Sequence, residues 1–211
     1  MRVLSYFLLI AIAYVVGSLN SAILITRFAL GKYKDIRTLG DGNPGATNVF
    51  QNVDKRMGFI VGAIDIAKGY FLPMIGAYFG VPEYMVLLIA LCVILGHDYP
   101  FIYDFKGGTG IAVTIGASLY FSAGITIFVV TISVLVMTSV TFIKQFKHID
   151  VNALEFGESA GFLFMLLMSL SGNLPSPARA FIVLAVTILV IRRIKNTKVV
   201  LKNIGSFLRR I

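Results

Sequence analysis

Apolar residues run along this chain in seven long segments, with few polar residues inside most of them. The segments cover about residues 3–25, 58–79, 84–103, 110–121, 123–143, 157–172 and 178–194. Because a helix needs about 20 apolar residues to cross a bilayer, this pattern predicts membrane spans rather than amphipathic helices of a soluble fold. The fourth and sixth segments are short, so we expect them to be tilted, buried among neighbours or partly re-entrant. We predict an all-α polytopic membrane protein with seven transmembrane helices, forming one domain over residues 1–211.

Composition supports a membrane protein and excludes several other classes. Of the 211 residues, 57% are hydrophobic and 14% are charged, whereas a soluble domain carries about 25% charged residues. The net charge of +9 would suit nucleic acid, but the basic residues lie in loops beside the apolar segments. Membrane topology and anionic headgroups explain them there, so we expect membrane lipids and no nucleic acid as partners. The one cysteine, Cys92, allows neither a disulfide nor a cysteine metal site.

The distribution of lysine and arginine predicts the orientation in the membrane. With seven spans, sixteen of the nineteen basic residues fall in loops and a C-terminal tail on one side. Arg2 and Arg179 stand on the other side, and Lys68 lies inside a segment. Cytoplasmic loops carry the excess of basic residues, so we predict an N-terminus outside and a C-terminus in the cytoplasm.

A glycine-rich loop, residues 40–48, follows the first segment. It contains Gly40, Gly42 and Gly45 with Asn43, Thr47 and Asn48, and Arg37 stands just upstream. Glycine leaves backbone N–H groups unobstructed, so such a loop can bind a phosphate. The same residue types are common in ordinary turns, and a turn-rich connector is an equal alternative on spacing alone. The nucleotide-binding P-loop pattern is absent.

A second glycine cluster, residues 106–110, follows the third segment. It contains Lys106, Gly107, Gly108 and Gly110, and the fourth apolar segment begins beside it. The free N–H groups of a helix N-terminus at this place would attract an anion. Glycines also let membrane helices pack closely, which is the structural alternative. Both loops are predicted on the cytoplasmic side, so we expect them to meet at one phosphate-binding pocket.

Ionisable residues inside the apolar segments are further candidates. Asp65 and Lys68 lie three residues apart in the second segment, where they share a helix face and can form an ion pair. A charge within a bilayer is costly, so the pair is either functional or a structural link between helices. His97 ends the third segment and suits a base, an anion donor or an interfacial hydrogen bond. His97 and His148 are distant in sequence, so we expect no metal site.

Together these motifs resemble one family. Residues 40–48, 65–69, 96–100 and 105–110 occur in the order and spacing of the bacterial acyl-phosphate:glycerol-3-phosphate acyltransferase family. The likeness extends over nearly the whole chain and is strongest over residues 10–116. It implies a small multi-pass enzyme of the bacterial inner (cytoplasmic) membrane, with seven spans and an active site toward the cytoplasm.

The resemblance also implies an activity. The family transfers an acyl chain from acyl-phosphate to the 1-hydroxyl of glycerol 3-phosphate, giving lysophosphatidate, with no cofactor or metal. Acyl-phosphate is already activated, so an enzyme can work by positioning two anions and stabilising the departing phosphate. On this basis we expect the catalytic residues to be Asn43, Thr47, Asn48, His97 and Asn196. We expect the substrate phosphates to bind Gly40, Gly42, Gly45, Arg37, Lys68, Lys106, Gly107, Gly108, Gly110 and Arg193.

Four positions depart from the family pattern. Asp41, Gln51, Thr109 and Arg193 stand where the family has serine, arginine, lysine and histidine. The replaced groups include ones that would contact the phosphate of glycerol phosphate, and an aspartate adds negative charge where an anion should bind. An alternative is therefore a divergent paralogue on the same scaffold, with another acceptor or no catalytic activity. A small membrane transporter fits the helix count, but the polar residues cluster at one side of the membrane rather than through it.

Overall fold

Every regular element in the described part of the chain is a helix, as predicted. The computed structural model describes residues 2–147, 152–170 and 174–208, and within these ranges it describes the side chains of residues 4–143, 145, 152–170 and 174–193. The elements are α1 (Arg2–Ser18), α2 (Ser21–Leu30), the 3-10 helix η1 (Ile36–Thr38), α3 (Ala46–Asn52), α4 (Lys55–Tyr78), α5 (Glu83–Asp98), the 3-10 helix η2 (Phe101–Tyr103), α6 (Ile111–Lys147), α7 (Ala153–Leu170) and α8 (Ser176–Leu208).

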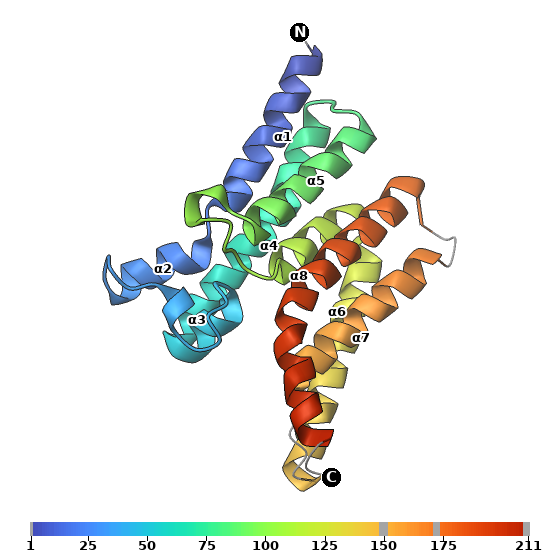
Figure 1. Cartoon of the computed structure of the whole chain (residues 1–211). Coiled ribbons are helices and arrows are strands. Elements are labelled where there is room, and N and C mark those ends of the chain that lie inside the picture. Colours follow the sequence, from blue (N-terminus) through green and yellow to red (C-terminus); the bar gives the residue numbers. More distant parts are fainter. Residues whose placement is uncertain (1, 148–151, 171–173, 209–211) are drawn as a thin grey trace.

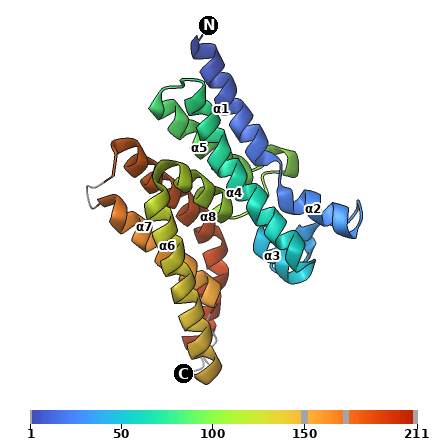
Figure 2. The same cartoon turned by 180° about the vertical axis from the view of Figure 1, so that it is seen from behind.

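The helices form two groups (Figure 1). In the first group, α1 and α4 pack on α5. The short helices α2 and α3 pack against α4. In the second, α7 packs on α6 and α8. The view from behind shows the same division (Figure 2). Contacts of α4 with α6, and of α5 with α8, join the two groups.

Five stretches of the described chain are long and apolar enough to cross a membrane. They are Leu4–Leu30, Lys55–Tyr78, Glu83–Tyr103, Ile111–Ile143 and Ala153–Leu170. The fourth and fifth predicted segments lie in one helix, α6, so they count as one candidate span instead of two. The seventh predicted segment lies in α8, where Arg179 and Arg192 flank an apolar stretch that is short for a span of about 20 residues. The count of seven spans stays a prediction.

The helix α6 is broken at Ser122, the position at which the sequence separates the segments 110–121 and 123–143. Ser122 has φ −160° and ψ 81°, which are not helical values. The part before the break packs against α4, and the part after it packs against α7, where a Cβ on Gly157 would crowd Ser133. The break therefore lets a single helix pack in both groups.

Backbone contact between α4 and α6 holds the two groups together. A Cβ on Gly69 would overlap the carbonyl oxygen of Val113, and a Cβ on Gly116 would overlap that of Ile66. Small residues allow this close approach between membrane helices. The contact fixes the first turns of α6, and with them the glycine-rich loop that precedes this helix.

Gly69→Ala is expected to lower the free energy of unfolding by about 1–3 kcal/mol, because the new methyl group must displace the backbone of α6. Gly62→Ala is the matched control in the same helix, since its new Cβ would lie 3.5 Å from the Ala46 Cβ, an ordinary contact. Alanine also favours helix over glycine, so the control should be neutral or stabilising. Thermal unfolding in one detergent compares the two. Equal melting temperatures would contradict the close α4–α6 approach.

Candidate active site

Both glycine-rich loops open onto one cavity of about 470 Å³. Its polar lining residues come from these loops, from α3, α4, α5, α7 and α8, and from the residue before α7: Asp41, Asn43, Thr47, Asp65, His97, Thr109, Asn152, Glu155, Glu158, Ser159 and Arg193. The loops also touch each other, since a Cβ on Gly108 would lie 3.2 Å from the carbonyl oxygen of Pro44. The prediction that the two loops meet at one pocket is confirmed.

Asn48 holds the first loop in shape. Its Nδ2 donates to the carbonyl oxygens of Ile36, Leu39 and Asn43 at 3.3, 2.9 and 3.0 Å. Its Oδ1 accepts a hydrogen bond of 2.7 Å from Asn52 Nδ2. The side chain is buried. The structure therefore uses Asn48 to fold the loop, whereas its neighbour Asn43 lines the cavity.

The glycines of this loop shape its turns. The N–H of Gly42 donates to the Leu39 carbonyl at 3.0 Å, and that of Gly45 donates to the Asn43 carbonyl at 2.9 Å. Gly40 and Gly42 have φ values of 55° and 75°, in the region that favours glycine. The N–H groups of Gly42 and Gly45 are thus used inside the loop, although we expected them at a phosphate. Of the three glycines, Gly45 lines the cavity.

Arg192 fastens the second loop to α8. The N–H groups of Gly107 and Gly108 donate to the carbonyls of Asp98 and His97, both at 3.2 Å. The carbonyls of the same two glycines accept from Arg192, at 2.7 Å from Nη2 and 3.1 Å from Nε. Both glycines are buried and fully engaged in these bonds. They position the loop rather than offering amides to a ligand.

Asp65 is the centre of a buried polar cluster in the cavity wall. Its Oδ1 accepts from Ser21 Oγ and lies 3.5 Å from Lys68 Nζ and 3.7 Å from His97 Nδ1. Lys68 Nζ also donates to the Leu19 carbonyl. One carboxylate thus links the start of α2 with α4 and α5. Asp65 and His97 both face the cavity, so the predicted intramembrane pair lies beside the site.

Two glutamates of α7 and an arginine of α8 also line the cavity. Arg193 Nη1 lies 2.6 Å from Glu158 Oε2. Glu155, one turn earlier on α7, accepts a hydrogen bond of 3.0 Å from Asn152 Nδ2. All four line the cavity. Sequence reasoning named Arg193 but not Glu155 or Glu158, although two acidic residues three apart at the start of an apolar segment were a usable signal.

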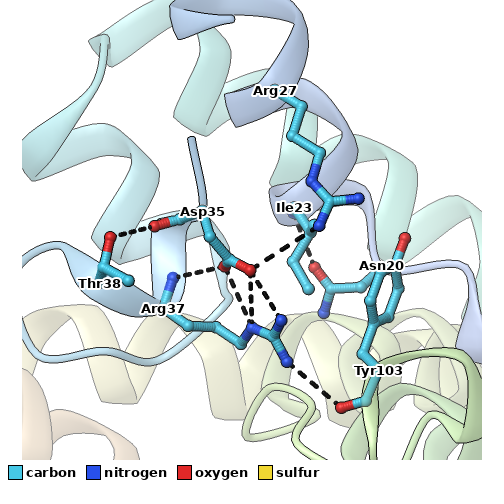
Figure 3. Close-up of polar contacts among 7 residues, drawn as sticks. All are labelled: Asn20, Ile23, Arg27, Asp35, Arg37, Thr38 and Tyr103. Carbon is cyan, nitrogen blue, oxygen red and sulfur yellow. Dashed lines mark hydrogen bonds and ion pairs between the residues drawn. The ribbon is translucent and has the colours of Figure 1, made fainter. Parts of the chain in front are cut away.

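Arg37 is not among the described lining residues of the cavity and holds the junction shown in Figure 3. Its guanidinium donates to Asp35 through Nε and Nη2, the latter at 2.7 Å, and its Nη1 donates to the Tyr103 carbonyl at 3.2 Å. This hydrogen-bonded pairing lowers the pKa of Asp35 and raises the pKa of Arg37. The Arg37 side chain therefore joins the 35–38 turn, which precedes the first glycine-rich loop, to η2.

The remaining expected residues lie as follows. Thr47 and Gly110 line the cavity. Lys106 is exposed and is not among the described lining residues. The side chain of Asn196 lies outside the described part of the structure.

An apolar cavity of about 310 Å³ adjoins the polar one between α6, α7 and α8. The residues that line both are Thr47, Ile111, Ile115, Leu154, Glu158, Phe162 and Leu189. The residues that line the apolar cavity alone include Val130, Val134, Met137 and Met165. The combined site therefore offers polar groups at one end and a space for a hydrocarbon at the other.

The lining of the polar cavity carries more negative than positive side chains. Four carboxylates, those of Asp41, Asp65, Glu155 and Glu158, line it, and Arg193 is the one lysine or arginine among the described lining residues. Across the described chain, no three His, Cys, Asp or Glu side chains group closely enough to hold a metal ion.

Comparison with known proteins gives a consistent picture. The family model described as "Glycerol-3-phosphate acyltransferase" matches residues 7–203. Among curated proteins, glycerol-3-phosphate acyltransferases of Aliivibrio fischeri (strain ES114) and Escherichia coli O1:K1 are 45% and 46% identical over 111 and 110 residues. These matches cover 52% of this chain and 54% and 52% of the relatives. The chain thus spans about half the length of the curated relatives it matches.

Two solved structures resemble the whole fold. Both are crystal structures of PlsY (YgiH), an integral membrane glycerol 3-phosphate acyltransferase, in a glycerol 3-phosphate form and a lysophosphatidic acid form. Each has a TM-score of 0.71 and covers 94% of this chain and 93% of the PlsY chain. The sequence identities are 28% and 26%.

Proposed function

The chain belongs to the glycerol-3-phosphate acyltransferase family, and from this premise we propose that it transfers an acyl group from acyl-phosphate to the 1-hydroxyl of glycerol 3-phosphate. In this reaction the bond between the acyl carbon and the phosphate oxygen breaks, and an ester forms with the acceptor hydroxyl, which loses its proton. The products are lysophosphatidate and inorganic phosphate. The enzyme is a multi-pass membrane protein, and we propose the bacterial inner membrane as its location.

The observation that carries this proposal is the junction of the polar and apolar cavities. An acyl-phosphate has a charged head and a hydrocarbon tail, and this site has a place for each. The acceptor and the departing phosphate would both occupy the polar part, near Thr47, Thr109 and Arg193. His97 stands in the wall with Asp65 beside it and suits proton transfer or a hydrogen bond to an oxygen. Because acyl-phosphate is already activated, positioning supplies much of the catalysis.

The proposed topology has seven spans, an outer N-terminus and a cytoplasmic C-terminus. The loop charge split supports it, as does the position of the start of α1 and the end of α8 at opposite ends of the molecule (Figure 1). Reporter fusions at residues 45 and 108 should both report the cytoplasm. Reporters on opposite sides of the membrane would contradict the proposal.

The direct test uses purified protein in detergent with acyl-phosphate and labelled glycerol 3-phosphate. We expect lysophosphatidate and inorganic phosphate in equal amounts. Acyl-CoA in place of acyl-phosphate is the donor control and should give no product. Phosphate release without lysophosphatidate would contradict the proposed acceptor.

A divergent paralogue with another acceptor, or without activity, is the second candidate. It is favoured by Asp41 and Glu155, two carboxylates in a cavity that should bind an anion. The same assay separates the candidates when glycerol replaces glycerol 3-phosphate. Acyl transfer to glycerol alone would support a neutral acceptor, and no transfer to either would support a silent paralogue.

Val130→Phe tests the apolar cavity as the acyl site. The added ring should shorten the accepted chain, and each displaced methylene should lower kcat/KM by roughly fourfold, the equivalent of about 0.8 kcal/mol. Ile127→Phe is the control, because Ile127 lies on the same helix, is 60% exposed and is outside the described lining. The measurement is kcat/KM for a series of acyl-phosphates of increasing length. An unchanged chain-length profile in Val130→Phe would place the acyl chain elsewhere.

A further inference from the structure

The ion pair between α7 and α8 forms part of the cavity lining. Arg193 Nη1 is 2.6 Å from Glu158 Oε2, and the two side chains are 30% and 17% exposed. Both residues line the polar cavity, and Glu158 also lines the apolar one. The pair therefore stands where the headgroup end and the hydrocarbon end of a ligand would meet.

An anion that enters this cavity encounters an arginine that already has a carboxylate partner. Charge-assisted hydrogen bonds to carboxylate and to phosphate use the same guanidinium donors. A phosphate must therefore take donors from Glu158 or bind beside a negative charge at close range, and both weaken its binding. Neutral or cationic ligands do not meet this competition.

We propose that Glu158 is a specificity-determining residue that sets the anion affinity of the site by competing with phosphate for Arg193. In the empty site it pairs with the arginine and holds it in the cavity. When a phosphate binds, the guanidinium turns from the carboxylate to the ligand, and the same exchange in reverse helps release the phosphate product. This inference rests on the proposed function for its substrate, but the exchange itself concerns any phosphate anion.

Glu155 provides a matched comparison. It is a glutamate on the same helix, one turn away, and lines the same cavity. Its described hydrogen bond goes to Asn152 rather than to Arg193. Asp41 faces the cavity from the first loop, where its Oδ1 accepts from the Asn43 N–H at 3.0 Å. Glu155→Gln also removes one negative charge from the cavity lining, but it leaves the Glu158–Arg193 pair in place.

Binding of inorganic phosphate, measured by calorimetry on the purified protein, tests the exchange without turnover. Glu158→Gln should lower the dissociation constant by about tenfold, since close charge pairs couple by this order or more. Glu155→Gln should change it by about twofold. The effect of Glu158→Gln should vanish when Arg193→Gln is also present, which a merely structural role for Glu158 would not produce. Glu158→Asp keeps the charge but withdraws the carboxylate, and it should fall between the unaltered protein and Glu158→Gln.

The result that would overturn the proposal is phosphate binding that is unchanged, weakened or undetectable in Glu158→Gln, or equally tightened in Glu155→Gln. Tighter phosphate binding caused by Glu158→Gln in a protein that also carries Arg193→Gln would overturn it as well. If the melting temperature shows that Glu158→Gln does not fold, Glu158→Asp takes its place. Phosphate binding that is not tighter in Glu158→Asp than in the unaltered protein would then overturn the proposal. In the turnover assay, most of the change should fall in the KM for glycerol 3-phosphate rather than in kcat. No turnover by any variant, with tighter phosphate binding in Glu158→Gln, would remove the proposed function and leave the exchange standing.

Discussion

Lys68→Met is expected to lower the free energy of unfolding by about 3–5 kcal/mol, because it leaves a buried carboxylate without its cation. Asp65 is 1% exposed, and Lys68 Nζ lies 3.5 Å from its Oδ1. The ammonium group also donates to the Leu19 carbonyl, which ties α4 to the end of α1. Methionine keeps the length of the side chain but removes both interactions. The loss should therefore exceed that of an ordinary surface substitution.

Chemical unfolding in mixed micelles measures this change. Lys55→Met is the control, because Lys55 is an exposed lysine at the start of the same helix and should stay within about 0.5 kcal/mol of the unaltered protein. Asp65→Asn combined with Lys68→Met should cost less than the sum of the two single changes, since neither charge is then left alone. If each single change leaves unfolding and activity untouched, the pair is incidental to the protein.

The architecture could be predicted from the sequence because it depends on features that are local in the chain. Long apolar segments predict helices whatever packs against them. The segments 110–121 and 123–143 were predicted as two spans, and the structure joins them in one helix, α6, that is broken at Ser122 between them. The meeting of the two glycine-rich loops followed from their predicted placement on one side of the membrane. These inferences needed no knowledge of which way any helix is rotated.

The roles of individual side chains could not be predicted in the same way. Arg192 and Arg193 are adjacent, yet one holds the second loop and the other enters the cavity, because neighbouring residues on a helix point about 100° apart. The glycine N–H groups could equally bind a ligand or the loop's own carbonyls, and the structure shows the second use for Gly107 and Gly108. Arg37 was expected to bind a substrate phosphate because of its charge. Its guanidinium instead donates to Asp35, which lies only two residues away in the sequence.

The positions that depart from the family differ in their relation to the cavity. Asp41, Thr109 and Arg193 line it, whereas Gln51 is exposed on α3 and is not among the described lining residues. Three of the four departures therefore change the charge or hydrogen bonding of the site itself. Arg193 places a permanent cation in the cavity lining, whereas Thr109 is uncharged.

If the unaltered protein is a working acyltransferase, Arg193→Gln is expected to raise the KM for glycerol 3-phosphate by roughly 10- to 150-fold. This corresponds to the loss of a charge-assisted hydrogen bond of about 1.5–3 kcal/mol. Arg37→Gln is the matched control, because Arg37 is bound to Asp35 and Tyr103 away from the cavity lining. It should leave KM nearly unchanged.

The triple change Asp41→Ser, Gln51→Arg and Thr109→Lys separates the working enzyme from a silent paralogue. In a working enzyme it should alter an activity that is already present, because Arg193 would already supply a cation to the phosphate. In a silent paralogue it should create lysophosphatidate formation where the unaltered protein shows none, because it removes a carboxylate from the cavity, adds one cation there at residue 109 and adds a second at residue 51, outside the described lining. A control with Asp41→Ala, Gln51→Met and Thr109→Met removes the carboxylate without adding cations.

We expect turnover by the unaltered protein, since its site already joins a cationic side chain and two formed loops to an apolar cavity. No turnover before the triple change, with turnover after it and none in the control, would overturn that expectation.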